Sequence, residues 1–529
     1  MPRVAVVGSG PAGIACAKAL ARRGAQVDLI DVGERLSADR ANLKQRLAAA
    51  APTHWSAADR AAAAENPTMR SGFPRKFLFG SDELLRGQHA AAPVAADWPI
   101  IAQNFAAGGL SVGWGAALLP IDTPDMAAWP FGRAALDASF ARVLADLPLA
   151  ARDDGLSTSF PLYGKSERAL PLPGALRDLL TDLGRGNLPA DFRFGQARLA
   201  VHTEAHEAGL GCQSCGLCLS GCPYGAIHTM TAELETLKRG NAIAYRDGLL
   251  ALAVREDERG PLLQLCDLAA GTRREDRYDS IFIAAGAFGS LRIALASQQA
   301  FDQPVVMRDS QKFILPLLRL KAAPMEWPRA LTLPGVFLDF KALDLSDHWI
   351  HTQISAMNGY VLERIGCGSD APAWRRALLR PIAERLLIAW CGLHSDHSAT
   401  VEAVLAAPDR TSPSTLRLAA RPHAEGRSAI RRAAGRLATA GRRFGTLAAT
   451  PLLQAVPVGG GNHLGGCLPM RRQPAARWDT DELGRLQAWR RIHFVDGAVL
   501  PSIPATTLAL TIMANADRIA MAAPLEGAA

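Results

Sequence analysis

Four cysteines in one short stretch have the spacing of a metal-binding site. Cys212, Cys215, Cys218 and Cys222, followed by Pro223, repeat the C-x2-C-x2-C-x3-C-P run of bacterial ferredoxins. Their thiolates suit an iron–sulfur cluster, and four thiolates also suit a tetrahedral zinc ion. We expect a [4Fe–4S] cluster here, with zinc as the main alternative; a disulfide-bonded loop or a loop without metal is also open.

Because the chain has a single run of this kind, the fourth ligand is not fixed by the spacing. In ferredoxins with two clusters, the fourth cysteine of such a run binds the other cluster. Either Cys222 closes its own site, or a distant thiol such as Cys467 completes it. The isolated cysteines are expected to be small buried side chains: Cys16, Cys266, Cys367 and Cys391.

A glycine-rich turn near the N-terminus is the second stretch with evident chemistry. The apolar run Val4–Val7 predicts a buried parallel strand, and a second run, Val27–Ile30, ends in Asp31. The turn and the start of the helix between them contain the residues expected to bind a dinucleotide: Gly8, Gly10, Pro11, Ala12 and Gly13.

These residue types have distinct physical roles in such a unit. Gly8 allows the tight turn, Gly10 lets the backbone approach a pyrophosphate, and Gly13 lets the helix pack closely on the strand. The helix N-terminus offers N–H groups and partial positive charge to the phosphates. Asp31 is placed to accept hydrogen bonds from a ribose. The sequence therefore predicts a dinucleotide-binding βαβ unit.

Strand signals that extend this sheet occur much later in the chain. The run 278–286 predicts a buried strand that ends in a glycine turn, with a helix over 291–296. Ile492–Val495 predicts another strand, which ends in Asp496 and Gly497. The nucleotide-binding domain must then be discontinuous. We assign to it residues 1–124, 200–300 and 456–529, with the cysteine loop at 212–223.

The rest of the chain, 125–199 and 301–455, is left for a second domain. Strand-like runs and helix-like runs in this part predict a sheet backed by helices. The strands are expected at 331–340 and 349–355, and the helices around 374–390 and 427–449. Residues 35–100 are polar and rich in alanine, and predict an insertion with loops after the first βαβ unit.

Composition excludes several classes of protein. The chain has 529 residues, of which 49% are apolar and 20% charged, as is typical of a globular protein of two domains. The first predicted strand begins at Val4, so we expect no signal peptide, and no apolar run is long enough to span a membrane. We expect a cytoplasmic protein with no nucleic-acid partner, because no nucleic-acid-binding motif is present.

The net charge of the chain is +8, and two helix-like segments are rich in basic residues. The segment Trp374–Trp390, interrupted near Pro381, has an apolar side. Arg427–Arg443 has several arginines among its polar positions. Either segment could lie on a membrane surface or pack as a solvated helix on a core. The apolar side of the first consists of Leu378, Leu379, Ile382, Leu386 and Leu387.

Four blocks together resemble the glucose–methanol–choline (GMC) family of FAD-dependent oxidoreductases. The resemblance implies an α/β fold with a discontinuous, Rossmann-like FAD-binding domain and an α+β substrate domain. The middle of the chain matches only in position and length. The blocks are the N-terminal turn, Gly108–Gly115, Ala284–Arg292, and a C-terminal group of His463–Met470, Val495–Ala498, Pro501–Pro504 and Leu510–Ala514.

The resemblance also implies roles for individual residues. His463 is expected over the reactive face of the flavin as the base that removes a hydroxyl proton, since histidine titrates near pH ~6.5. The family places a second His or Asn at the start of the last helix, where this chain has Thr507, a candidate catalytic residue that could hydrogen-bond a substrate oxygen but is a poor base. His394 or His397 could supply a further group. The residues expected along the flavin are Gly108, Gly109, Ser111, Trp114, Gly115, Gly286, Asp496 and Gly497.

The main hypothesis is an FAD-dependent enzyme that oxidises a CH–OH group of a sugar, polyol or other alcohol. A cluster at the cysteines would favour a dehydrogenase with an external electron acceptor over an oxidase. A lipid alcohol at a membrane surface is a second substrate class. The alternatives are a flavin-containing lyase or isomerase without net oxidation, which Thr507 keeps open, and a protein that only relays electrons.

Overall fold

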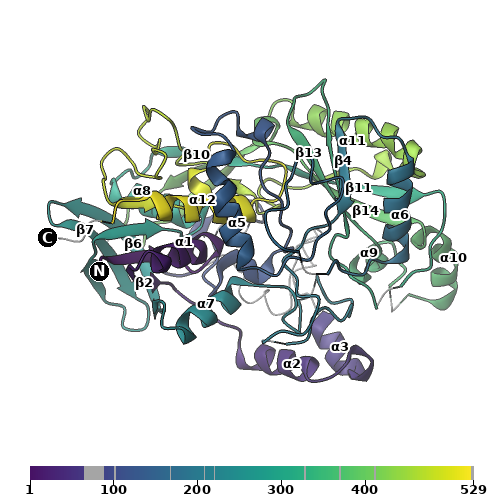
Figure 1. Cartoon of the computed structure of the whole chain (residues 1–529), viewed down its shortest axis with the longest axis horizontal. Helices are drawn as coiled ribbons and strands as arrows, with labels where there is room; N and C mark the ends of the chain where they lie inside the picture. The colour runs from purple at the N-terminus through teal and green to yellow at the C-terminus, as the bar shows by residue number, and fades with distance from the viewer. Residues whose placement is uncertain are drawn as a thin grey trace.

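The described residues of the computed structural model form three larger sheets and one three-stranded sheet, and Figure 1 views the molecule with its long axis horizontal. The two termini lie at one end of that axis. The structure describes residues 1–64, 89–100, 103–166, 168–207, 209–219, 221–326, 329–368, 371–409 and 413–525. Part of the predicted insertion at 35–100 lies outside these residues.

The first sheet is parallel and has the strand order β20-β9-β1-β2-β5. Val4 pairs with Val27 on one side and with Ser280 on the other, so β1 lies at the centre of the sheet. Its strands come from distant parts of the chain, and the predicted Rossmann-like fold is confirmed. The strands are β1 (Arg3–Val7), β2 (Gln26–Ile30), β5 (Ala244–Arg246), β9 (Ser280–Ile283) and β20 (Ile492–Phe494).

Helices and a small antiparallel sheet accompany the parallel sheet. α1 (Pro11–Arg22) packs against α12 (Ala509–Ala522), and α12 packs against α5 (Ala134–Ala145). α8 (Ala287–Ser297) lies against β6 of the antiparallel sheet. The remaining elements here are α7 (Met230–Arg239), β6 (Leu249–Asp257), β7 (Gly260–Asp267) and β8 (Arg273–Arg277).

The second large sheet is antiparallel, as the predicted substrate domain requires. Its strand order is β17-β11-β14-β13-β12-β4, and β18 also pairs with β11. Its strands are β4 (Phe192–Gln196), β11 (Lys312–Arg319), β12 (Val336–Lys341), β13 (Trp349–Ser355), β14 (Leu386–Gly392), β17 (Thr446–Ala448) and β18 (Gln454–Ala455). The helices of this part are α6 (Gly174–Arg185), α9 (Gly359–Arg364), α10 (Ala373–Ala383) and α11 (Gly426–Gly441).

A third sheet, β19-β10-β15-β16-β3, links the two parts. Its strand β19 (Leu464–Gly465) directly follows His463 and pairs with β10 (Pro304–Asp309). This pairing carries the His463 segment to the start of β11. The other strands are β3 (Val94–Ala95), β15 (Thr400–Leu405) and β16 (Leu416–Arg421).

Several predicted boundaries were wrong. The helix expected over 374–390 ends at Ala383, and Leu386–Gly392 forms β14 between β11 and β13. The strand expected over 331–340 begins at Val336, and the helix expected over 427–449 ends at Gly441. Among the described helices, none combines the length and the apolar composition that are needed to cross a bilayer.

Candidate cofactor and active site

The glycine-rich turn between β1 and α1 is closed by backbone atoms alone. Gly8 has φ +100° and donates its N–H to the Ile30 carbonyl over 2.8 Å. A Cβ on Gly8 would lie 2.4 Å from the Ala284 oxygen, and a Cβ on Gly13 would lie 1.8 Å from the Gly8 oxygen. Both contacts are impossible, so β1, α1 and the end of β9 approach one another only because these residues are glycines.

A second glycine loop lies directly against this turn. Gly109 has φ +57°, and a Cβ there would lie 2.8 Å from the Cα of Gly10. Gly10 precedes Pro11 at the start of α1 and has no side chain to cap the first N–H groups. These groups are therefore available to phosphate oxygens, as a bound dinucleotide requires. We call Gly8, Gly10, Gly13, Gly108 and Gly109 the glycine cradle.

Hydrogen bonds through Ser9 connect Asp31 to both glycine loops. The Ser9 hydroxyl donates to the Asp31 carboxylate and accepts the N–H of Gly108 over 2.8 Å. Tyr245 Oη lies 3.4 Å from the same carboxylate. Burial raises the pKa of Asp31 to about 7, although these hydrogen bonds oppose the shift. Asp31 thus lies directly after β2, where its carboxylate can accept a hydrogen bond from a ribose hydroxyl.

Asp496 holds the corresponding position after β20. It accepts the Ala498 N–H over 2.9 Å and the Ser290 hydroxyl over 2.5 Å. Burial raises the pKa of Asp496 to about 6. Gly286, with φ +76°, begins the turn into α8 and lies among the groups that hydrogen-bond this carboxylate.

His463 is connected to the Asp496 segment through the strand that follows it. Gly466 donates its N–H to the Gly497 carbonyl over 2.9 Å, and a Cβ on Gly465 would lie 2.2 Å from that same oxygen. The His463 carbonyl accepts the N–H of Ser310 over 3.2 Å. Backbone contacts therefore hold the segment of the half-buried His463 between the residues that follow β20 and the link from β10 to β11.

Thr507 has an internal role in the structure. Its side chain is buried, and its Oγ1 accepts the N–H of Leu119 over 2.8 Å. It lies two residues before α12 rather than at the first helical residue. The hydroxyl thus ties the segment before α12 to residue 119, and it supplies no base.

Lys312 is a residue near the site that the sequence analysis missed. Its buried ammonium donates to Ser310 Oγ over 2.8 Å and to the Ala505 carbonyl over 3.2 Å. A Cβ on Gly461 would lie 2.6 Å from Lys312 Cγ, so the lysine lies under the segment that leads to His463. Burial lowers the pKa of Lys312, and the nearby Asp309 carboxylate opposes that shift. A single lysine at a strand start carries no sequence signal for this role.

The residues expected beside the flavin ring are braced by the segment 227–231. Ser111 is fully buried, donates to the Gly108 carbonyl over 2.6 Å and accepts the Met230 N–H over 2.9 Å. Trp114 is half-buried, and its indole N–H donates to the His228 carbonyl over 2.7 Å. Gly115, also half-buried, directly follows Trp114. Ser111 therefore shapes this loop from inside the protein.

The four predicted metal ligands line one pocket. Cys212, Cys215, Cys218 and Cys222 all face it, together with apolar side chains that include Leu331 of the second domain. Among the described residues, these cysteines included, no three thiol sulfurs lie within 4.8 Å of one another.

The insertion after the first βαβ unit covers this pocket. α2 (Ala38–Ala48) and α3 (Ala57–Ala64) lie at the lower edge of the molecule in Figure 1, near α7. Trp55 stacks on Tyr224, whose hydroxyl donates to the Ala50 carbonyl over 2.7 Å. These residues form a small buried cluster with Cys215. Burial raises the pKa of the Cys215 thiol, so a cation is needed to hold it as a thiolate.

A half-buried and a buried histidine form a second polar group beside the large antiparallel sheet. His348 stacks on His394 with ring centroids 3.6 Å apart, and its Nδ1 lies 3.0 Å from Asp125. Burial favours the neutral ring, but hydrogen bonds to Asp125 and Asp396 outweigh it and raise the pKa of His348 to about 9. The ring planes are within 14° of parallel, so in-plane lone pairs of the two rings do not converge on one metal ion. We interpret the group as an imidazolium stacked on a neutral imidazole.

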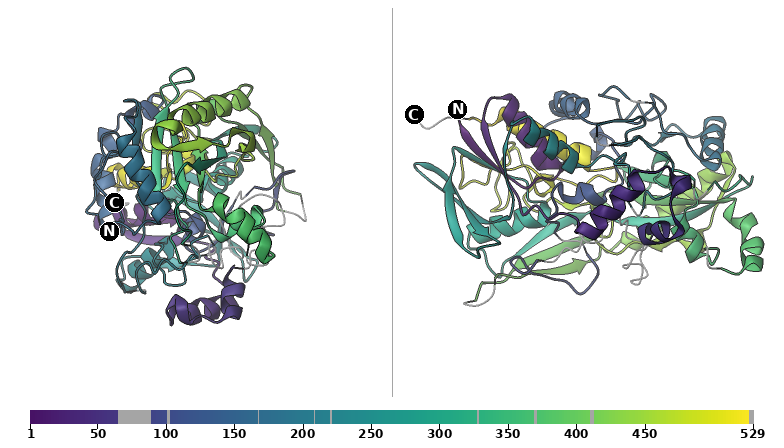
Figure 2. Two further views of the ribbon diagram at one scale, coloured as in Figure 1. Left: turned by 90° about the vertical axis from the view of Figure 1, so that its right-hand side faces the viewer. Right: turned by 90° about the horizontal axis from the view of Figure 1, so that it is seen from below.

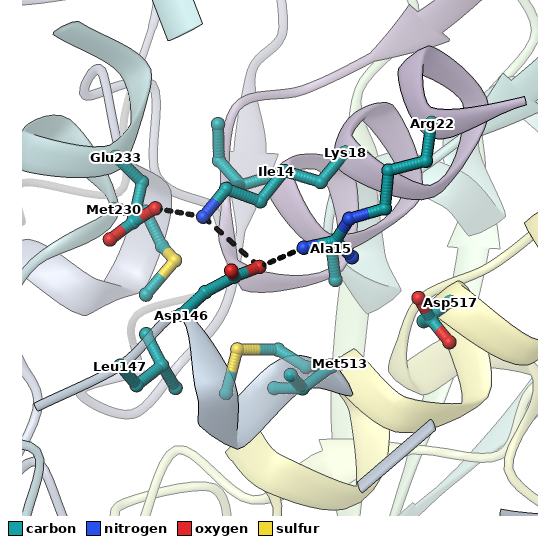
Figure 3. A pocket seen from close by; sticks show the side chains of 11 residues that line it. Ile14, Ala15, Lys18, Arg22, Asp146, Leu147, Met230, Glu233, Met513 and Asp517 are labelled. Carbon is teal, nitrogen blue, oxygen red and sulfur yellow. Dashed lines mark hydrogen bonds and ion pairs between the residues drawn. The ribbon is translucent and has the colours of Figure 1, made fainter. Parts of the chain in front are cut away.

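Figure 3 shows a pocket on a different side of α1, between α5, α7 and α12. Its charged side chains neutralise one another: Lys18 pairs with Glu233 and with Asp146, the latter over 3.3 Å. Arg22 pairs with the same Asp146 over 2.5 Å. The pocket contains no member of the glycine cradle and no candidate base, so we do not assign the chemistry to it.

Comparison with known proteins agrees with this reading of the fold. Residues 2–88 match the family model described as pyridine nucleotide-disulphide oxidoreductase. Over its whole length, the chain can be compared by fold with a solved structure. The chain is similar in fold to pyridoxine 4-oxidase from Mesorbium loti, with a TM-score of 0.60 and 16% sequence identity over 98% of each chain. A search of curated protein sequences found no match.

Proposed function

We propose that this protein is an FAD-dependent oxidoreductase that oxidises a CH–OH group. The glycine cradle carries the proposal, because it brings two side-chain-free loops, an uncapped helix N-terminus and Asp31 together at one end of the parallel sheet. This set suits the pyrophosphate and ribose of a dinucleotide. The division into 1–124, 200–300 and 456–529 for FAD and 125–199 and 301–455 for substrate is part of the proposal.

His463 acts in this proposal as the base for the substrate hydroxyl. It takes the proton from the hydroxyl oxygen while a hydride leaves the carbon that bears this oxygen. The C–O bond thereby becomes the C=O bond of a carbonyl product. FAD, when bound, supplies the hydride acceptor at N5. Lys312 positions the segment that carries this base. It packs against Gly461, and its ammonium donates a hydrogen bond to the Ala505 carbonyl. Thr507 takes no proton, because its hydroxyl is engaged with the Leu119 N–H.

We also propose a [4Fe–4S] cluster in the cysteine pocket, in preference to zinc. Support comes from a pocket lined by all four thiols, which follow one another with the spacing of a ferredoxin run. The segment 227–231 leads from this pocket to Trp114 and Ser111 through the bonds of His228 and Met230. A cluster would supply one-electron transfer to an external acceptor, which favours a dehydrogenase. The fold neighbour is named as an oxidase, so the acceptor must be tested directly.

Anaerobic reduction of the bound flavin by a panel of alcohols tests the proposal. The panel contains sugars, polyols, long-chain alcohols and, because of the fold neighbour, pyridoxine. We expect one class to bleach the flavin, and His463→Asn to slow bleaching about 100-fold or more while flavin content is unchanged. Turnover of a substrate without bleaching would contradict the proposal and favour a lyase or isomerase. Reoxidation by oxygen and by ferricyanide then separates oxidase from dehydrogenase.

A further inference from the structure

Helix α10 exposes an apolar stripe at the edge of the molecule. Trp374, Leu378 and Ile382 are 69%, 67% and 50% exposed, and their spacing of four residues places them on one face of the helix. Of the eleven residues of α10, only Ala383 is buried and only Leu379 is half-buried. The helix is thus attached through a narrow side, and its widest apolar surface faces outward. We call Trp374, Leu378 and Ile382 the α10 stripe.

One arginine lies beside this stripe and two lie behind it. At 100° per residue, Arg375 follows the Ile382 edge, whereas Arg376 and Arg380 lie on the opposite side of the helix. All three are exposed, and α10 contains no acidic residue; Glu384, directly after it, pairs with Arg380 over 2.7 Å. The neighbouring segment adds exposed Leu320 and Lys321, because Ala323 donates its N–H to the Glu384 carbonyl.

The position of α10 allows contact with a flat surface. Figure 1 places α10 at the end of the molecule opposite the two termini, and the view in Figure 2 that looks onto that end shows it at the periphery. An exposed helix there presents its stripe without a wall of neighbouring elements on both sides. A convex, basic and apolar face of this kind fits an anionic lipid surface better than it fits a protein groove.

We propose that α10 binds the protein peripherally to membranes that contain anionic lipids. The helix would lie in the plane of the interface, with the α10 stripe among the upper acyl chains and Arg375 against lipid phosphates, while the arginines on the opposite side add longer-range attraction to the anionic surface. Eleven residues cannot span a bilayer, so the contact is superficial and reversible. The inference does not depend on the proposed oxidation of an alcohol.

Flotation of the purified full chain with vesicles tests this inference. We expect binding to vesicles of 30% phosphatidylserine in phosphatidylcholine, little binding to phosphatidylcholine alone, and partial release at about 0.5 M salt. The triple variant W374S/L378S/I382S should weaken binding about tenfold or more, and R375Q/R376Q/R380Q should remove the preference for phosphatidylserine. Leu343→Ser is the matched control, because Leu343 is 64% exposed beyond β12.

Three outcomes would overturn the inference. One is no flotation of the wild-type chain at low salt, and another is equal flotation of the triple variant and the Leu343→Ser control. The third is a stripe-dependent dimer in light scattering without vesicle binding, which would assign the stripe to self-association. Unchanged flavin content and melting temperature in the variants show that lost binding is not lost folding.

Discussion

The glycine cradle and the cysteine pocket lie at the two ends of residues 227–231 and are built by opposite means. In the cradle, backbone atoms meet where side chains are missing, so its shape exists before any ligand binds. In the pocket, four thiols face a shared space, and burial raises the pKa of the Cys212, Cys215 and Cys222 thiols. The shape of the cradle depends on glycines that lack side-chain atoms. The pocket instead depends on a bound cation that stabilises its thiolates.

The strongest test of this difference is Gly13→Ala. The added Cβ would lie 1.8 Å from the Gly8 oxygen, which is backbone and cannot rotate away. We expect the variant to lose nearly all flavin and to be destabilised by more than about 3 kcal/mol, measured by flavin absorbance and thermal melting. Gly435→Ala is the control, since no atom lies within 4 Å of its Cβ position. A Gly13→Ala protein with full flavin would contradict the rigid cradle.

A substitution in the cysteine pocket should remove the metal and leave the flavin bound. Cys215→Ser removes one ligand and leaves the cradle intact, so we expect iron and acid-labile sulfide to disappear while one flavin per chain is kept. Activity with external acceptors should fall at least about tenfold. Metal and sulfide analysis of anaerobically purified protein measures this, and Cys266→Ser, an isolated thiol outside the pocket, should change nothing. About one zinc and no sulfide in the wild type would refute the cluster.

Lys312→Met tests the buried lysine that contacts the segment leading to His463. Methionine retains most of the packing but loses the bonds to Ser310 and Ala505. We expect flavin reduction to slow about tenfold, and the pH profile to lose the limb that the lowered pKa of Lys312 produces. Anaerobic stopped-flow measurements from pH 6 to 9 follow both effects. The exposed Lys321→Met serves as control, and an unchanged pH profile in Lys312→Met would rule out the positioning role.

The smallest expected effect concerns His348. Its pKa is raised from about 6.5 unfolded to about 9 folded, so its stabilisation is complete below pH 6.5 and is lost as the pH rises through 9. Because Asp396 is half-exposed, we expect only about 1–2 kcal/mol from this pair. Melting curves from pH 6 to 10 should slope downward in the wild type and less so in His348→Gln. His54→Gln, at an exposed position far along the chain from this group, should retain the wild-type slope.

The local sequence pattern was sufficient to predict the central strands of the parallel sheet. Val4–Val7 and Val27–Ile30 coincide with β1 and β2 to within one residue, and Ile492–Val495 coincides with β20. These runs are short, apolar and bounded by glycine or charge, which is the pattern of a central parallel strand. The fold class followed from them together with the resemblance.

Pattern was insufficient where distant strands decide the outcome. Leu386 and Leu387 continue the helical spacing of Leu379 and Ile382, yet they form β14 because β11 and β13 pair with them on both sides. Periodicity cannot separate such a run from a helix. Pro381 did not help, since it lies inside α10 and does not end it.

The site shows the same limit. The approach of Lys312 to Gly461 and Ala505 depends on three segments that are far apart in sequence. The cover of the cysteine pocket by Trp55 and Tyr224 is equally non-local. No feature of the residues near Lys312 or Trp55 distinguishes them from ordinary core positions, so only the three-dimensional structure reveals them.

The parallel sheet also sets an order of assembly during protein synthesis. β1 and β2 leave the ribosome first, but β20 and α12, which complete the sheet and cover α1, follow more than 450 residues later. At about 5–20 residues per second, the first βαβ unit waits at least about twenty seconds for these partners. During that interval its apolar faces are open to chaperones, so cofactor loading is a late event that follows translation of the last helix.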